Sequence, residues 1–144
     1  MRKAERRLLL AGSVLFLLAL LVGLAVPKFA VPRLGLSTHL LGIMQGLFLM
    51  VAGLIWPGLK LPRNAARIGI WLAVYGCYAA WSANLFAAIS GSGNTMLPIA
   101  AGPARGSALE EGIIAVGLRT AAVSLIVVLL MMVWGLRGAG NRES

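Results

Sequence analysis

The sequence predicts an all-α integral membrane protein, a four-transmembrane-helix bundle that forms a single domain over residues 1–144. Of its residues, 60% are hydrophobic and only 12% are charged, and the mean hydropathy is +0.91, which is outside the range of soluble domains. Four nearly uncharged runs, at about 8–26, 37–56, 68–89 and 113–136, are each long enough as helices to cross a hydrocarbon core of roughly 30 Å. Because the runs lack the period-two alternation of barrel strands, helices are the remaining way to span a membrane.

The first run is expected to stay in the protein as a helix. A basic start, MRKAERR, followed by an apolar run resembles a secretory signal peptide. The run is longer than the apolar part of such a peptide, and Pro27-Lys28-Phe29 is a poor cleavage site. Prolines and glycines separate the four runs. The longest connection, 90–112, contains the apolar string TMLPIAAGP, so we expect it to fold back over the end of the bundle.

The distribution of basic residues predicts the orientation. Nine lie on one side of the predicted helices: Arg2, Lys3, Arg6, Arg7, Lys60, Arg63, Arg67, Arg137 and Arg142. Three lie on the other: Lys28, Arg33 and Arg105. Cytoplasmic loops carry the excess of Lys and Arg, so both termini and the middle connection are expected in the cytoplasm. The net charge of +9 is thereby explained by topology and lipid headgroups, and no nucleic-acid partner is expected.

Polar side chains inside the predicted helices are candidate functional groups because they are costly in a membrane. They are His39, Gln45, Tyr75, Tyr78, Ser82, Asn84 and Arg119. His39 shares a helix face with three glycines, Gly42, Gly46 and Gly53. Such a stripe allows close helix packing, with the histidine bonding across the interface. Alternatively, the imidazole ligates haem iron, and Gly42 and Gly46 leave room for the flat cofactor. A lone histidine cannot build a three-ligand zinc site.

The third run carries two adjacent polar and aromatic faces. Trp71, Tyr75, Tyr78 and Ser82 form one face, and Cys77, Trp81 and Asn84 form the next. An aromatic wall with hydroxyl and amide groups suits a small aromatic substrate, and plain helix packing is the alternative. The single cysteine is expected to be a small buried residue. Because none of the four runs contains an acidic residue, the sequence disfavours a proton-coupled exporter.

Several strings in this order resemble the bacterial membrane-bound hydroxylaminobenzene mutases. They are AVPKFAVPRLGLSTHLLGIMQGLFLMVAGLIWP, LAVYGCYAAWSANLFAA, MLPIAAG and the final WGLRG, and they extend through nearly the whole chain. The resemblance implies an enzyme of the bacterial inner membrane. It also implies the reaction, conversion of hydroxylaminobenzene to 2-aminophenol by transfer of the hydroxyl from nitrogen to the ortho carbon.

The chain also resembles, more distantly, styrene oxide isomerase, a four-helix enzyme that forms a trimer with haem b between subunits. That family has a histidine ligand followed six residues later by asparagine and then glycine. Here His39 is followed six residues later by Gln45 and then Gly46, so the asparagine is replaced by a longer amide. The resemblance implies a haem ligand at His39 and a substrate contact at Gln45. It matches the active-site tyrosine to Tyr78, with Tyr75 as the second choice.

Together these observations predict a homo-oligomeric isomerase, expected to be a trimer, that acts on a small aromatic hydroxylamine in the lipid bilayer with haem b as its cofactor. Tyr78 or Tyr75 would donate a proton to the departing oxygen, and Gln45 with Asn84 would orient the amino group. Trp81 would supply a stacking surface. Two alternatives remain open from the sequence: a transporter of small amphiphiles and a non-catalytic assembly subunit.

Overall fold

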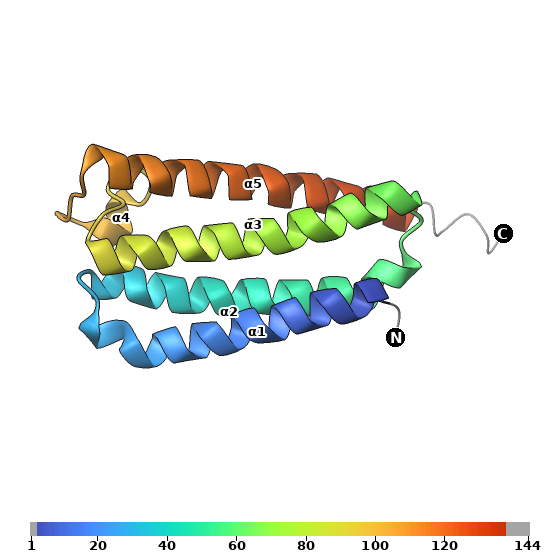
Figure 1. Cartoon of the computed structure of the whole chain (residues 1–144), viewed down its shortest axis with the longest axis horizontal. Coiled ribbons are helices and arrows are strands. Elements are labelled where there is room, and N and C mark those ends of the chain that lie inside the picture. The colour runs from blue at the N-terminus through green and yellow to red at the C-terminus, as the bar shows by residue number, and fades with distance from the viewer. Residues whose placement is uncertain (1–2, 138–144) are drawn as a thin grey trace.

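Four long helices form the protein (Figure 1). The computed structural model describes residues 3–137. The long helices are α1 (Lys3–Ala25), α2 (Pro32–Ile55), α3 (Arg63–Ser90) and α5 (Ala108–Arg137), and the short ones are η1 (Val26–Lys28), η2 (Trp56–Gly58) and α4 (Pro98–Ala101). Each long helix is long and apolar enough to cross a membrane, and the described residues contain no strand. The predicted class, an all-α four-helix membrane protein, is confirmed.

Each long helix begins five residues before the predicted run. The observed starts are 3, 32, 63 and 108, whereas the apolar runs begin at 8, 37, 68 and 113. The ends agree within one residue. The uncharged run marks the apolar part of each helix, but the helix itself begins in the preceding segment, which carries at least one charged residue. Pro32 occupies the first turn of α2, where a missing N–H costs nothing. Ser107 and Glu110 form a reciprocal capping box before α5, with the Ser107 N–H donating to Glu110 Oε2 at 2.7 Å.

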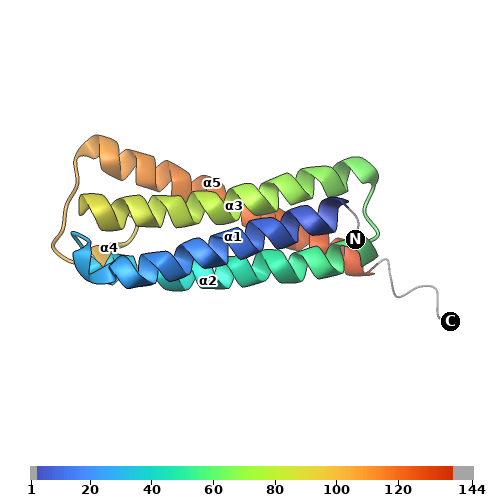
Figure 2. The ribbon, with the colours of Figure 1, turned by 60° about the horizontal axis from the view of Figure 1, so that its bottom comes forward.

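The helices are arranged as two pairs that share a core. α1 packs along α2, α3 packs along α5, and α2 joins the pairs through α3 (Figure 1). In Figure 2, α5 passes behind α3, on the side away from α1. The shared core includes Leu15 of α1, Leu49 of α2, Cys77 of α3 and Val128 of α5. Cys77 is buried and free, as expected. Leucines and valines remain exposed along α1 and α5, where a membrane would cover them.

The glycine stripe of α2 is covered by α1. A Cβ on Gly46 would lie 2.9 Å from the Gly12 carbonyl oxygen, and one on Gly42 would lie 2.6 Å from Ala19 Cβ. A Cβ on Gly53 would lie 3.2 Å from Leu8 Cβ. These distances are shorter than ordinary contacts, so the glycines are what lets the two backbones approach. We expected Gly42 and Gly46 to leave room for a flat cofactor, and this expectation is wrong for the single chain, because α1 fills the space beside them.

The long connection folds back over the end of the bundle, as expected. Ala101 of α4 packs in a small core with Leu34 of α2 and Ile114 of α5. The Glu111 carboxylate holds the connection by accepting hydrogen bonds from four backbone N–H groups, those of residues 93, 94, 95 and 106, at 2.7–3.3 Å. A charged acceptor with four donors is a strong anchor for a chain segment.

The two ends of the bundle differ in charge. One end, here called the basic end, is where α1 and α3 begin and α2 and α5 end; the other, the loop end, carries 91–107 (Figure 1). The basic end holds Lys3, Arg6, Arg7, Lys60, Arg63, Arg67 and Arg137, and the loop end holds Lys28, Arg33 and Arg105. Arg2 and Arg142, also counted from the sequence, lie outside the described residues. The structure therefore groups the basic residues as the sequence predicted.

Candidate functional site

His39 lies on α2 and reaches across to the backbone of α1. Its Nδ1 is 2.7 Å from the carbonyl oxygen of Ala19. A carbonyl oxygen only accepts, so Nδ1 carries the proton in this hydrogen bond and Nε2 keeps its lone pair in the neutral ring. Metal-bound histidines usually hold their other nitrogen in this way. Within residues 3–137, no three His, Cys, Asp or Glu side chains gather into a metal cage.

Gly23 makes room for this imidazole. A Cβ at Gly23 would lie 2.5 Å from His39 Nδ1 and 2.7 Å from His39 Cε1, far inside contact distance. His39 borders an open groove of about 610 Å³ between α1 and α2. Its other lining residues are apolar: Leu20, Leu21, Gly23, Leu24, Val26, Pro27 and Leu36. Reasoning from sequence missed both Gly23 and Ala19, because nothing in the sequence aligns α1 with α2 at this level.

Three polar side chains predicted for the site are buried in the bundle without partners. Gln45, Trp81 and Asn84 are only 8%, 7% and 4% exposed. In the described part of the protein, Gln45 Oε1, Trp81 Nε1 and Asn84 Oδ1 have no hydrogen-bond partner. The Trp81 indole lies against Gly42, whose Cβ would be 2.6 Å from Trp81 Nε1. Leaving a buried polar group unpaired costs about 1–3 kcal/mol, so each of these three groups could take a hydrogen bond from a ligand.

Gln45 also borders a hollow of about 250 Å³ between α2, α3 and α5. The remaining lining is apolar: Leu41, Met44, Phe48, Cys77, Leu125 and Leu129. An apolar hollow with one amide at its wall suits a small, mostly apolar molecule with one polar end. Cys77, Trp81 and Asn84 form the inward face of α3, which settles which of the two predicted faces lies inside.

The two tyrosines lie in different places. Tyr78 is half-buried and donates a hydrogen bond to the Ala11 carbonyl oxygen of α1 at 2.9 Å. Tyr75 is 49% exposed, and its hydroxyl is 2.8 Å from Thr120 Oγ1 of α5. Tyr78 therefore contacts the core, while Tyr75 lies on the outer surface, where it borders a different hollow.

His39 and Gln45 lie on different sides of α2. Six residues at about 100° each leave the two side chains roughly 120° apart around the helix. Accordingly, His39 reaches α1, whereas Gln45 faces the hollow bordered by α3 and α5. One chain therefore presents its histidine and its buried amide to different surroundings, and the structure does not bring these two predicted site residues together.

The fold defines an all-α membrane protein with four long apolar helices, and its buried polar groups lie among apolar side chains. The family model of styrene oxide isomerase matches residues 4–137. Hydroxylaminobenzene mutase HabB of Ectopseudomonas oleovorans is 48% identical over 139 residues, covering 96% of this chain and 85% of that protein. Hydroxylaminobenzene mutase HabA of the same organism is 44% identical over 104 residues, covering 72% and 77%. No solved structure matches.

The chain belongs to the styrene oxide isomerase family. The resemblances stated from the sequence, to hydroxylaminobenzene mutases and to styrene oxide isomerase, are both confirmed. The protein is accordingly an enzyme, an isomerase of the mutase type, in a membrane. This replaces the two alternatives that the sequence left open, the transporter and the non-catalytic assembly subunit.

Proposed function

We propose that the protein is a hydroxylaminobenzene mutase that converts an arylhydroxylamine to the corresponding 2-aminophenol. The observation that carries this proposal is the 48% identity to HabB over 96% of the chain. The candidate residues lie on α2 and α3, in the middle of the chain. In the reaction the N–O bond breaks, a C–O bond forms at the ortho carbon, and the ortho proton is lost while nitrogen regains one. The product is an isomer of the substrate, so no external oxidant or reductant is consumed.

We also propose that His39 holds haem b. Two observations support the fit. The Nδ1 proton is already bonded to Ala19, which leaves Nε2 available as a ligand, and the adjacent groove is apolar and open. Gly23, which has no side chain, leaves the room that the imidazole needs in this position. When bound, haem b would supply an iron that polarises the N–O bond as a Lewis acid.

The chain's own side chains could orient the substrate, stack against its ring and donate a proton. The unpaired oxygens of Gln45 and Asn84 can accept hydrogen bonds from the N–H and O–H of a hydroxylamine, and this would fix its orientation. Trp81 offers an aromatic surface and an unpaired N–H. Tyr78 is a better candidate than Tyr75 for proton donation, because it contacts the core. To act, its hydroxyl would have to exchange the Ala11 carbonyl for the substrate oxygen.

A homo-oligomer, proposed here as a trimer, would complete this site. His39 and Gln45 face different surroundings within one chain, so a reaction centre that uses both needs two copies. The glycine stripe no longer supports this proposal, since α1 covers it. The support comes instead from the open apolar groove beside His39, whose leucines are exposed in the single chain.

The test compares haem content with turnover in purified variants. Wild-type protein is expected to show a Soret band and to convert hydroxylaminobenzene to 2-aminophenol. His39→Ala should lose both. Gln45→Ala should keep the band and lose turnover on the order of a hundredfold, because its amide would act on the substrate. Tyr75→Phe is the matched control and should keep both, because Tyr75 lies on the outer surface.

Three results would each contradict one of the proposals. Wild-type protein that binds haem but leaves hydroxylaminobenzene unchanged would overturn the substrate assignment. Haem-free His39→Ala protein with full mutase turnover would overturn the role of haem and leave the substrate assignment standing. A strictly monomeric mass in detergent, with activity retained, would overturn the oligomer.

A further inference from the structure

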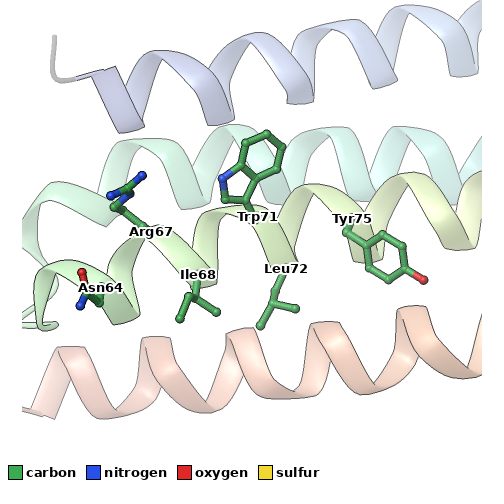
Figure 3. A pocket seen from close by; sticks show the side chains of 6 residues that line it. All are labelled: Asn64, Arg67, Ile68, Trp71, Leu72 and Tyr75. Atoms are coloured by element: carbon green, nitrogen blue, oxygen red, sulfur yellow. The ribbon is translucent and has the colours of Figure 1, made fainter.

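A hollow on the surface of α3 has a cationic end and an apolar body. It has a volume of about 570 Å³ and is lined by Asn64, Arg67, Ile68, Trp71, Leu72 and Tyr75 (Figure 3). All six residues come from α3 at spacings of one, three and four, so they share one side of the helix. In Figure 3, Arg67 and Trp71 turn toward the α1 side, and Ile68 and Leu72 turn toward α5. The proposed reaction uses none of these six residues.

The hollow extends along α3 for a little less than half the thickness of a hydrocarbon core. Arg67 lies in the second turn of α3, at the basic end, and Tyr75 follows eight residues later. At 1.5 Å per residue, the two are separated by about 12 Å along the helix, close to half of a hydrocarbon core of roughly 30 Å. Trp71, 67% exposed, lies between them, as interfacial tryptophans do. With the membrane boundary at the charged start of α3, Arg67 would lie at headgroup depth and the residues after it at the depth of an acyl chain.

The charge at the mouth of the hollow favours an anion. Among residues 3–137, Arg67 has no hydrogen bond or ion pair with another side chain. It also borders a second hollow of about 260 Å³, which Arg63 lines as well. The only acidic residue that the described part places at this end is Glu5, on α1. Arginine pairs with phosphate oxygens through two parallel N–H donors.

We propose that this hollow binds one anionic phospholipid. Arg67 would hold the phosphate, with the Asn64 amide as a second donor, and one acyl chain would lie over Ile68, Leu72 and Tyr75. The apolar length and the cationic mouth together select an anionic lipid over free phosphate, which cannot use the apolar part, and over a zwitterionic lipid, whose phosphate charge is already balanced. The site is separate from the His39 groove and from the Gln45 hollow, and it does not depend on the proposed reaction.

The experiment is native mass spectrometry of the detergent-solubilised protein with added phosphatidylglycerol or phosphatidylcholine. Wild-type protein is expected to retain one phosphatidylglycerol per chain in preference to phosphatidylcholine. Arg67→Gln should weaken this retention by about fivefold or more, the factor expected for one arginine at a membrane surface. Arg137→Gln is the matched control, because it removes a charge at the same end but outside both hollows. Inorganic phosphate at millimolar concentration should not displace the lipid.

Equal retention by wild type and Arg67→Gln, equal retention of the two lipids, or displacement by phosphate would each overturn the proposal. If Arg67→Gln fails to fold, brominated phosphatidylglycerol added at one equivalent to otherwise wild-type protein gives a second measurement. The bromine atoms should quench the fluorescence of Trp71, which lines the hollow. Quenching should therefore be lost in Trp71→Phe and kept in Trp134→Phe, since Trp134 is similarly exposed but belongs to α5. Equal quenching in the two variants would also overturn the site.

Discussion

Replacing Gly23 with alanine is expected to displace the His39 imidazole. The new Cβ would lie 2.5 Å from His39 Nδ1, whereas ordinary contacts begin near 3.4 Å, so the ring must move by about 0.9 Å. The hydrogen bond from Nδ1 to Ala19, now 2.7 Å long, would then stretch beyond hydrogen-bond distance. Losing that bond costs about 1 kcal/mol, and overpacking costs about 1–3 kcal/mol, so a total of about 2–4 kcal/mol is expected.

Thermal unfolding in detergent, followed by circular dichroism, measures the loss of stability, and Soret absorbance per chain measures haem retention. Gly23→Ala should lower both. Gly112→Ala is the matched control, because Gly112 lies on α5 with no atom within 4 Å of the position that a Cβ would take, so the change should be neutral or slightly stabilising. Wild-type stability in Gly23→Ala would refute the packing argument. Lower stability with unchanged haem content would refute the proposed role of His39 as a haem ligand.

Three further predictions concern the bundle itself. Glu111→Gln should loosen the connection 91–107, because a neutral amide is a weaker acceptor for its four N–H groups; hydrogen exchange of those amides should become faster while α1 to α3 stay protected. Gly42→Ala should lower the unfolding temperature strongly, since the new Cβ would lie 2.6 Å from Trp81 Nε1; unchanged stability would contradict the close approach of α1, α2 and α3. Reporter fusions should place 59–62 in the cytoplasm and 91–107 on the other side, and the reverse result would contradict the charge argument.

The sequence predicted much of the fold, because the number and ends of membrane helices depend on properties of short stretches of sequence. Length, hydropathy and basic residues can be read position by position, and they predicted four helices whose ends agree within one residue. The starts were less accurate, since a search for uncharged runs leaves out first turns that carry a charge, such as those that begin at Pro32 and after Ser107. The fold-back of the long connection was predicted from its apolar string, but the Glu111 anchor was not, because its four partners lie five to eighteen residues away.

The candidate site shows where sequence reasoning reaches its limit. The sequence alone singled out His39, Gln45 and Asn84 as candidates, because polar groups in an apolar run are costly and therefore few. Only the tertiary structure decided that α1 fills the glycine stripe beside Gly42, since that depends on which helix packs there. It also decided that His39 bonds to Ala19 while Gln45 faces α3 and α5, because helix rotation and pairing are set by packing across the whole bundle.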